Sequence, residues 1–357
     1  MHLQEVFVTG FRNLIDQSLA LSPGFNLIVG ENGAGKTAFL EALYSLARGR
    51  SFRTTKTTSV IHSEADSFLV RGDLVGAGQS TSIGLRKSRD GTTEIRIGGE
   101  SSNRMSALAE KLPVNVVLPT SSELVFGGPA RRRDLLDWGL FHVKHDYLAS
   151  ASAFARLLRQ RNAWLKTQQP TSPDADPWLG QLLDLAESIN SAREWYVAEL
   201  QNAVSPVLES LGFDESIRLE YGIDTDSLRK KVLESWARDV KSGTTNYGPH
   251  RADMKVGCAG GLAADILSRG QGKLVASALQ ITQSVLLEQH VNRKALLLVD
   301  DFGAELDAER FQAFSEVLAG LECQVVGTSV KGMGENRLMD AQSRVFHVKQ
   351  GVITLPE

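Results

Sequence analysis

The sequence predicts an α/β protein in which a helical lobe is inserted between two segments rich in strands. Three observations favour this fold class. The run "FNLIVG" at residues 25–30 is continuously apolar and ends in glycine, which is typical of a strand buried on both faces. Strand-like runs return from residue 295, in "ALLLVDD" and "CQVVGTS". Between these ends, at residues 131–211, apolar side chains recur with a helical period.

The N-terminal segment predicts further strands and one helix. Strands are expected in "LQEVFVTGF", "SFLVRGDLVG", "STSIGLRKS" and "TTEIRIGG", and "RDG" joins the last two as a hairpin-like turn. A helix is expected from about Gly35 to Ala47, directly after the first apolar run. Near the C-terminal end, "RVFHVKQGVITL" predicts two strands joined at a Gln350-Gly351 turn.

The middle of the chain predicts an antiparallel helical hairpin. Apolar residues follow one another by three or four positions from Leu182 to Val207, and a partner helix is expected from Phe154 to Leu165. The polar stretch "QQPTSPDADPW" between them is rich in proline, which ends a helix. We therefore expect residues 1–118 and 250–357 to form the α/β lobe, and residues 119–249 to form the inserted helical lobe.

Composition and charge exclude several classes of protein. The chain has 357 residues, of which 42% are hydrophobic and 23% charged, as in ordinary globular proteins. Its formal net charge of -3 means that a nucleic acid would have to bind to a local basic patch. Cys258 and Cys323 form no CxxC motif, so no local zinc site or redox pair is expected. Without a basic-then-apolar leader or an apolar run of about 18 residues, we expect a cytoplasmic protein with no membrane contact.

The segment "GENGAGKT" predicts a phosphate-binding loop, because it lies between a buried strand and a helix. Its residues are Gly30, Glu31, Asn32, Gly33, Ala34, Gly35, Lys36 and Thr37. The glycines let backbone N–H groups surround phosphate oxygens at the positive end of a helix. The Lys36 ammonium supplies charge to the β and γ phosphates, and the Thr37 hydroxyl is a ligand for Mg²⁺. The sequence therefore predicts a site for a nucleotide such as ATP with Mg²⁺.

Two carboxylates complete the predicted site. Asp300 follows four apolar residues and is expected at the carboxyl end of a buried strand, where ligands of such sheets bind. We expect Asp300 to hold Mg²⁺ through water, and Asp301 to orient the attacking water.

The order of motifs resembles that of ABC ATPases. A Ser-x-Gly-Gln motif, Ser268 to Gln271, precedes the acidic strand, and the stretch ending in Asp307 follows it. The resemblance implies that Ser268, Gly270 and Gln271, with Asp307, bind the γ-phosphate of ATP held by a second copy of the chain. An exposed N-cap on an ordinary helix is the alternative. Gly270 and Gly272 are expected to allow close backbone approach, and Lys273 to be a surface charge.

The chain also resembles the RecF family of bacterial DNA replication and repair proteins. The segments that carry this resemblance are "GFRN", "GRSFRT", "GGPARRRDLLD", "YGPHRAD" and "LSRGQGK", in family order over most of the chain. The resemblance implies an ABC-type P-loop ATPase head that forms a homodimer with ATP, binds double-stranded or gapped DNA, and helps to load recombinase at single-strand gaps. It implies RecR and RecO as partners, a part in the SOS response, and association with the nucleoid. The alternative is the nucleotide-binding subunit of a transport ATPase.

Several residues are assigned through related ATPase heads. Arg12 and Asn13 resemble residues that lie beside the nucleotide phosphates and base. Thr328 stands where many ABC ATPases have a histidine, and its hydroxyl donates hydrogen bonds but accepts no proton near neutral pH. Asp301 replaces a commoner glutamate, so slow hydrolysis is expected. The segment "LPTSSEL" at residues 118–124 departs from the family pattern, so no role is transferred to it.

Clustered cations predict where DNA binds. The first candidates follow the phosphate-loop helix and are Arg48, Arg50, Arg53 and Lys56. Further candidates are Arg131 to Arg133, Arg156, Arg159 and Arg161 with Lys166, and Lys230 with Lys231. Each cluster alone is equally compatible with a solvated helix face. Phosphate contacts of this kind give affinity without sequence preference and with a steep dependence on salt.

Overall fold

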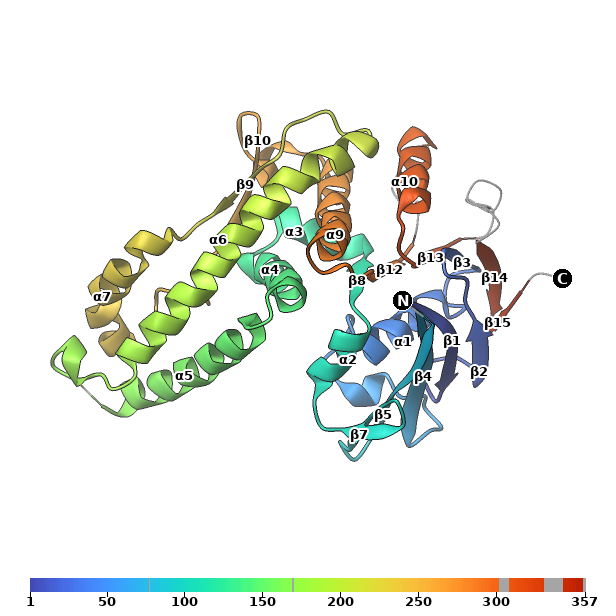
Figure 1. Cartoon of the computed structure of the whole chain (residues 1–357), viewed down its shortest axis with the longest axis horizontal. Helices are drawn as coiled ribbons and strands as arrows, with labels where there is room; N and C mark the ends of the chain where they lie inside the picture. Colours follow the sequence, from blue (N-terminus) through green and yellow to red (C-terminus); the bar gives the residue numbers. More distant parts are fainter. Residues whose placement is uncertain (77, 169, 302–307, 331–342, 356–357) are drawn as a thin grey trace. The chain divides into compact units, whose positions relative to one another are not determined.

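The computed structural model describes residues 1–76, 78–168, 170–301, 308–330 and 343–355 (Figure 1). The chain divides into two compact units. The α/β unit comprises Met1–Ser121, Val207–Phe213 and Leu287–Glu357, and the helical unit comprises Ser122–Pro206 and Asp214–Leu286. The division of the sequence into segments 1–118, 119–249 and 250–357 stays a prediction.

The first sheet of the α/β unit is mainly parallel. Its order is β15-β14-β3-β13-β12-β8, and β15 runs antiparallel to β14. The strands are β3 (Phe25–Val29), β8 (Val114–Val117), β12 (Leu296–Val299), β13 (Val325–Ser329), β14 (Arg344–Lys349) and β15 (Val352–Thr354). Every residue of β3, β12 and β13 is buried, which explains why their sequences are continuous runs without alternation.

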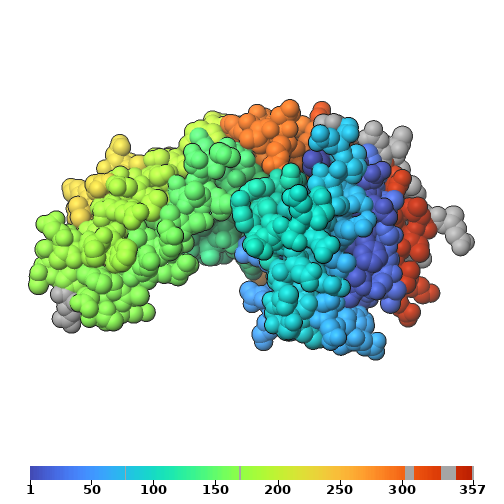
Figure 2. Space-filling view, turned by 60° about the horizontal axis from the view of Figure 1, so that its bottom comes forward, coloured from blue at the N-terminus to red at the C-terminus, as the bar shows by residue number. Residues whose placement is uncertain are grey.

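The second sheet of this unit is antiparallel, in the order β2-β1-β4-β5-β6-β7. Its strands are β1 (His2–Thr9), β2 (Gln17–Ala20), β4 (Ser67–Gly76), β5 (Gln79–Ser88), β6 (Thr93–Ile97) and β7 (Glu100–Ser102). The strands expected in the first hundred residues are confirmed, with β2 and β7 in addition. Figure 2 shows a side of the unit on which these strands contribute to the surface.

Helix α1 (Lys36–Arg48) packs against strands of both sheets, among them β4, β5, β12 and β13. Most of its side chains are buried, and they belong to the main hydrophobic core of the unit. The helix ends at Gly49, whose left-handed backbone donates its N–H to the Ser45 carbonyl. The other helices of the unit are α2 (Met105–Lys111), α10 (Ala308–Gly320) and the 3₁₀ turns η1 (Thr57–Ser59) and η2 (Pro119–Ser122).

The helical unit contains the expected hairpin. Helices α5 (Tyr147–Thr167) and α6 (Leu179–Ser210) run antiparallel, and the proline-rich stretch with η3 (Pro173–Ala175) joins them (Figure 1). The other helices are α3 (Glu123–Phe126), α4 (Pro129–Val143), α7 (Thr225–Ser242), α8 (Ala263–Ile266) and α9 (Arg269–Val291). A small sheet of β9 (Arg218–Tyr221), β10 (Met254–Cys258) and β11 (Gly261–Leu262) was not predicted. None of the described helices combines the length and hydropathy that crossing a bilayer requires.

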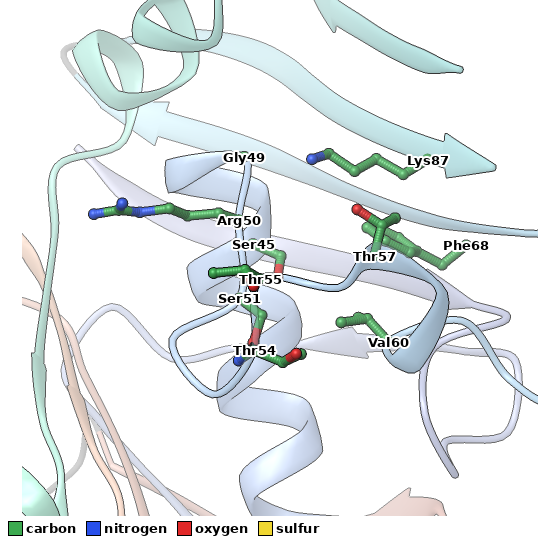
Figure 3. A pocket seen from close by; sticks show the side chains of 10 residues that line it. All are labelled: Ser45, Gly49, Arg50, Ser51, Thr54, Thr55, Thr57, Val60, Phe68 and Lys87. Carbon is green, nitrogen blue, oxygen red and sulfur yellow. Dashed lines mark hydrogen bonds between the residues drawn. The ribbon is translucent and has the colours of Figure 1, made fainter. Parts of the chain in front are cut away.

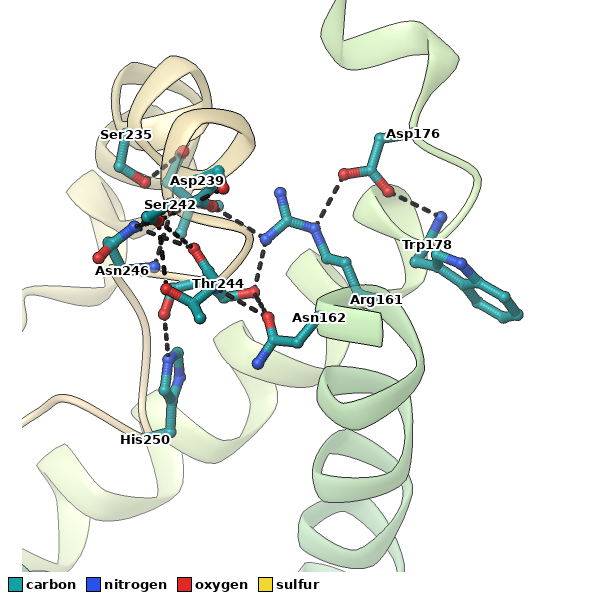
Figure 4. A network of polar contacts seen from close by, with 12 residues as sticks. Arg161, Asn162, Asp176, Trp178, Ser235, Asp239, Ser242, Thr244, Asn246 and His250 are labelled. Carbon is teal, nitrogen blue, oxygen red and sulfur yellow. Dashed lines mark hydrogen bonds and ion pairs between the residues drawn. The ribbon is translucent and has the colours of Figure 1, made fainter. Parts of the chain in front are cut away.

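Arg161 corrects one of the predictions for DNA contacts. Its side chain is fully buried in the helical unit and forms ion pairs with Asp176 and Asp239 (Figure 4). The Arg161 Nη1 also donates to the Thr245 hydroxyl at 2.6 Å. A guanidinium without solvent exposure cannot reach a DNA phosphate, so this residue joins three segments of the helical unit instead.

Candidate nucleotide-binding site

The phosphate loop connects the end of β3 to the start of α1, as its sequence predicts. Gly33 and Gly35 have φ angles of 80° and 122°, which side chains other than glycine rarely adopt. Gly35 is the N-cap of α1, so the following N–H groups point out of the helix end. Glu31 and Asn32 are exposed at the tip of the loop. The loop therefore presents backbone donors at a helix N-terminus, as an anion requires.

The Lys36 side chain folds back onto the loop. Its Nζ donates to the Gly30 carbonyl at 2.7 Å and to the Glu31 carbonyl at 3.0 Å. Burial lowers the pKa of Lys36 from its usual value, while Asp301 and Asp300 act in the opposite direction. The two carbonyls are weak partners for an ammonium, so an arriving phosphate would be a stronger one.

Asp300 lies directly after β12 and forms the centre of a hydroxyl–carboxylate network. The Thr37 hydroxyl is 2.9 Å from one Asp300 oxygen and 3.2 Å from the other. The Thr328 hydroxyl donates to Asp300 at 2.8 Å and accepts from the Asp301 N–H at 2.8 Å. Burial raises the pKa of Asp300, against the effect of the two threonine hydrogen bonds. The side chains in this network offer only oxygen atoms as metal ligands, and one of them is a desolvated carboxylate. Such a set of ligands suits Mg²⁺.

The nucleotide pocket is a cavity of about 370 Å³ at the carboxyl ends of the parallel strands. Asp301 lines it with a left-handed backbone, at a φ of 55°. The lining residues are Asn13, Asn32, Gly33, Gly35, Lys36, Thr37, Ala38, Arg53, Pro119, Asp300, Asp301 and Thr328. The fold therefore brings together the loop, both acidic residues and Thr328, which are far apart in the sequence.

The Glu41 carboxylate organises one side of this region, and the sequence reasoning missed it. Glu41 is fully buried in α1 and accepts two hydrogen bonds from Arg12, at 2.9 and 2.6 Å. It also accepts from the Ser51 hydroxyl and lies 3.9 Å from the Arg53 guanidinium. A glutamate on the apolar face of a predicted helix was the signal that could have revealed it. Arg12, expected beside the nucleotide, is directed to this carboxylate.

The remaining predicted residues of the α/β unit take different places. Asn13 donates its side-chain N–H to the Gly33 carbonyl at 3.0 Å, so it supports the phosphate loop. Arg53 lines the nucleotide pocket, whereas Arg50 and Lys56 are exposed and Arg48 is half-buried. In the divergent segment at residues 118–124, the Ser121 hydroxyl accepts a hydrogen bond from the Leu118 N–H, so it stabilises the turn in which it lies.

The predicted signature motif opens helix α9 in the helical unit. The Ser268 hydroxyl accepts from the Gln271 N–H at 3.3 Å, and the Gln271 side chain accepts from the Ser268 N–H at 2.9 Å. This reciprocal pair is a capping box. The pair leaves the hydroxyl proton of Ser268 and the N–H groups of Arg269 and Gly270 at the helix start outside the capping bonds. The structure thus shows an N-cap, and the first N–H groups of the helix remain outside its capping bonds.

Two further residues of α9 serve packing. A Cβ on Gly272 would lie 2.3 Å from the Phe126 ring, so a larger residue there would displace the ring of α3. Lys273 was expected to be a surface charge, but it is 7% exposed, so that expectation is wrong. Asp307 lies outside the described residues.

Comparisons with known proteins bear on this arrangement. A family model described as the RecF/RecN/SMC N terminal domain matches residues 2–354. The DNA replication and repair protein RecF of Vibrio vulnificus (strain CMCP6) is 36% identical over 357 residues, covering 99% of each chain. The protein of the same name from Shewanella loihica is 36% identical over 364 residues, covering 100% of both.

The chain belongs to the RecF family. A solved structure of the recombination mediator protein RecF-ATP in the RecFOR pathway matches with a TM-score of 0.88 at 26% identity, covering 100% of this chain and 98% of that chain. An SMC head bound to the C-winged helix domain of ScpA matches with a TM-score of 0.62 at 15% identity, covering 100% and 97%, and shows the fold alone. The expected ATPase-head fold and class of DNA replication and repair protein are confirmed. The transport ATPase alternative is not favoured.

Proposed function

We propose that this RecF-family protein binds ATP with Mg²⁺ in the pocket between the phosphate loop and the carboxyl ends of β12 and β13. The observation that carries the proposal is the contact between Thr37 and Asp300, at 2.9 Å. One residue comes from the phosphate loop and the other from the acidic strand, and together they provide the oxygen ligands that Mg²⁺ takes beside a triphosphate. The related structure of RecF-ATP supports the choice of ATP.

The phosphate loop, Asp301 and Thr328 each have a role in this proposal. The Lys36 ammonium leaves the two loop carbonyls and pairs with the β and γ phosphates, while the backbone donors of residues 33–37 surround their oxygens. Bound Mg²⁺ neutralises charge on the phosphates. Asp301 orients the attacking water, and Thr328 holds the backbone of Asp301 in place through its 2.8 Å hydrogen bond.

Hydrolysis by this set of residues is slow, so that ATP acts as a switch. Asp301 is one methylene shorter than a glutamate, and Thr328 cannot accept a proton near neutral pH. A bound nucleotide therefore persists long enough to maintain a dimer. Turnover of many ATP molecules per second by the isolated protein would contradict this part of the proposal.

The dimer forms when the start of α9 in one copy meets the γ-phosphate bound to the other. The Ser268 hydroxyl proton and the free N–H groups of Arg269 and Gly270 are the donors, at the positive end of a long helix. Gln271 holds Ser268 in position, and Asp307 belongs to the same contact. ATP-dependent closure places the protein on double-stranded or gapped DNA, where Arg48, Arg50, Arg53 and Lys56 contact phosphates, and RecR and RecO assist in loading recombinase.

Sedimentation with ATP and Mg²⁺ tests the contact between copies. Ser268→Arg is expected to bind ATP like the wild type but to remain monomeric, because its side chain occupies the place of the γ-phosphate. Ser152→Arg is the control, since Ser152 is exposed in α5 of the same unit. Dimerisation of Ser268→Arg at wild-type ATP concentrations would refute the proposed contact.

A further inference from the structure

A second pocket lies in the α/β unit, at the C-terminal end of α1. It is a small cavity of about 40 Å³, room for a few water molecules or one small oxyanion. Figure 3 shows its lining residues: Ser45, Gly49, Arg50, Ser51, Thr54, Thr55, Thr57, Val60, Phe68 and Lys87. None of them lines the nucleotide pocket. The two pockets are therefore separate sites. The segment from Gly49 to Thr57 lines the second pocket, and within it Arg53 lines the nucleotide pocket instead.

The lining of this pocket is cationic and uncompensated. It contains Lys87 and Arg50 and no carboxylate. Lys87 lies on β5 directly opposite Phe68 and shares a sheet face with the buried Leu85, so its stem is partly covered. Among the described residues, no side chain forms an ion pair or hydrogen bond with Lys87, and burial alone lowers its pKa. A partly desolvated ammonium without a counter-ion is costly, and an anion would relieve that cost.

Ser45 provides an independent observation. Its side chain is 2% exposed, and its Oγ has no hydrogen-bond partner among the described residues. A serine within a helix commonly bonds the carbonyl four residues earlier, but this one does not. Figure 3 shows Ser45 on α1 beside Thr55, with Thr57 on the side of Lys87. A buried hydroxyl that lacks a partner has an unmet hydrogen bond, and the pocket is where a ligand can meet it.

We propose that this pocket binds a phosphate group, with Lys87 as its counter-charge and the Ser45, Thr55 and Thr57 hydroxyls as its hydrogen-bond donors. The small volume admits one tetrahedral oxyanion and no base or sugar. The phosphate is a backbone group of DNA or a free phosphate ion, two sources of the same chemistry. The DNA source rests on the proposed function, and it agrees with Arg50 and Lys56, which are exposed on the same loop.

Two variants and one control test the site. Lys87→Gln removes the charge, and Ser45→Ala removes a hydroxyl that has no partner among the described residues, so the latter should fold with unchanged thermal stability. Arg86→Gln is the matched control, because Arg86 precedes Lys87 on β5, is exposed and points to the opposite face of the sheet. Circular dichroism during heating verifies that all three proteins fold.

Two binding assays distinguish the sources of phosphate. In the first, fluorescence anisotropy follows duplex DNA with ATP and Mg²⁺ over a range of salt concentrations. A DNA phosphate in the pocket predicts that Lys87→Gln lowers the slope of log affinity against log salt by about one and weakens binding about tenfold near 0.1 M salt. Ser45→Ala should weaken binding less and leave the slope unchanged, and Arg86→Gln should match the wild type.

In the second assay, calorimetry measures binding of inorganic phosphate without DNA. Phosphate binding that Lys87→Gln and Ser45→Ala abolish, together with unchanged DNA affinity, would support the site with the free ion as its ligand. If both variants match Arg86→Gln in both assays, the proposal is overturned. Failure of the wild type to bind DNA would instead contradict the proposed function, and the phosphate assay would still decide the pocket.

Discussion

Replacement of Arg161 by alanine should unfold the helical unit at much lower denaturant concentrations. The Arg161 Nε donates to Asp176 at 2.8 Å and the Nη1 donates to Asp239 at 2.9 Å, and all three side chains have no solvent exposure. Without the guanidinium, two carboxylates remain in the interior without their counter-charge. Removal of one partner from a buried ion pair costs about 3–5 kcal/mol.

Tryptophan fluorescence is a selective assay for this prediction. All five tryptophans, Trp138, Trp164, Trp178, Trp195 and Trp236, lie in the helical unit. The backbone N–H of Trp178 donates to Asp176 at 3.1 Å, so one of the tryptophans adjoins the network itself. With a urea dependence of about 1–3 kcal/mol per molar, a loss of about 3–5 kcal/mol lowers the midpoint of the fluorescence transition by about 1–5 M.

A neighbouring arginine provides the control. Arg159 is exposed on the same helix, and its replacement by alanine should change the free energy of unfolding by less than about 0.5 kcal/mol. Equal fluorescence midpoints for Arg161→Ala and Arg159→Ala would refute the assignment of Arg161 to a stabilising buried network.

Two further predictions concern packing and thiol chemistry. Gly272→Ala places a Cβ 2.3 Å from the Phe126 ring and should destabilise the helical unit by about 1–3 kcal/mol, measured by the same fluorescence transition. Adding Phe126→Leu should restore part of this loss. If the stability effects of the two substitutions simply add in the double variant, the clash is contradicted. Burial raises the pKa of Cys323 to about 12, so its thiol should react with a disulfide reagent only when the α/β unit opens, whereas Cys258 reacts in the folded protein. The folded state holds the Cys323 proton more tightly than the unfolded state does. The protonated thiol therefore makes its full contribution to stability below about pH 9, and this contribution declines as the pH rises towards 12. If Cys323→Ala loses as much stability above pH 9 as the wild type does, this prediction is wrong.

The sequence was most informative where local patterns alone determine structure. The continuous apolar runs of β3 and β12 indicated a sheet covered on both faces, and the phosphate loop followed because a strand, glycines and a helix are adjacent in the chain. The hairpin of α5 and α6 was predictable because a long apolar stripe and a proline-rich interruption are also local signals.

Features that depend on contacts between distant segments were not predictable. Arg161 and Arg159 are both arginines on one predicted helix, and only the positions of Asp176 and Asp239 distinguish a buried cation from a solvated one. Glu41 on the apolar face of a predicted helix indicated a buried carboxylate, but the sequence did not show that Arg12 and Ser51 would be its partners. Short strands such as β9 carry too few residues for a period to be visible.

Two glycines of the signature segment separate the two interpretations of that helix start. Gly272 is accounted for by the chain itself, because the Phe126 ring occupies the space of a side chain. Gly270 is different, since a Cβ there would meet nothing within 4 Å. A glycine in a helix costs about 1 kcal/mol relative to alanine, and packing within the chain does not explain that cost. The capping box of Ser268 and Gln271 requires no glycine at this position either. The open space beside Gly270 therefore agrees with the proposed approach of an anion from outside the chain, to a helix start whose first N–H groups lie outside the capping bonds.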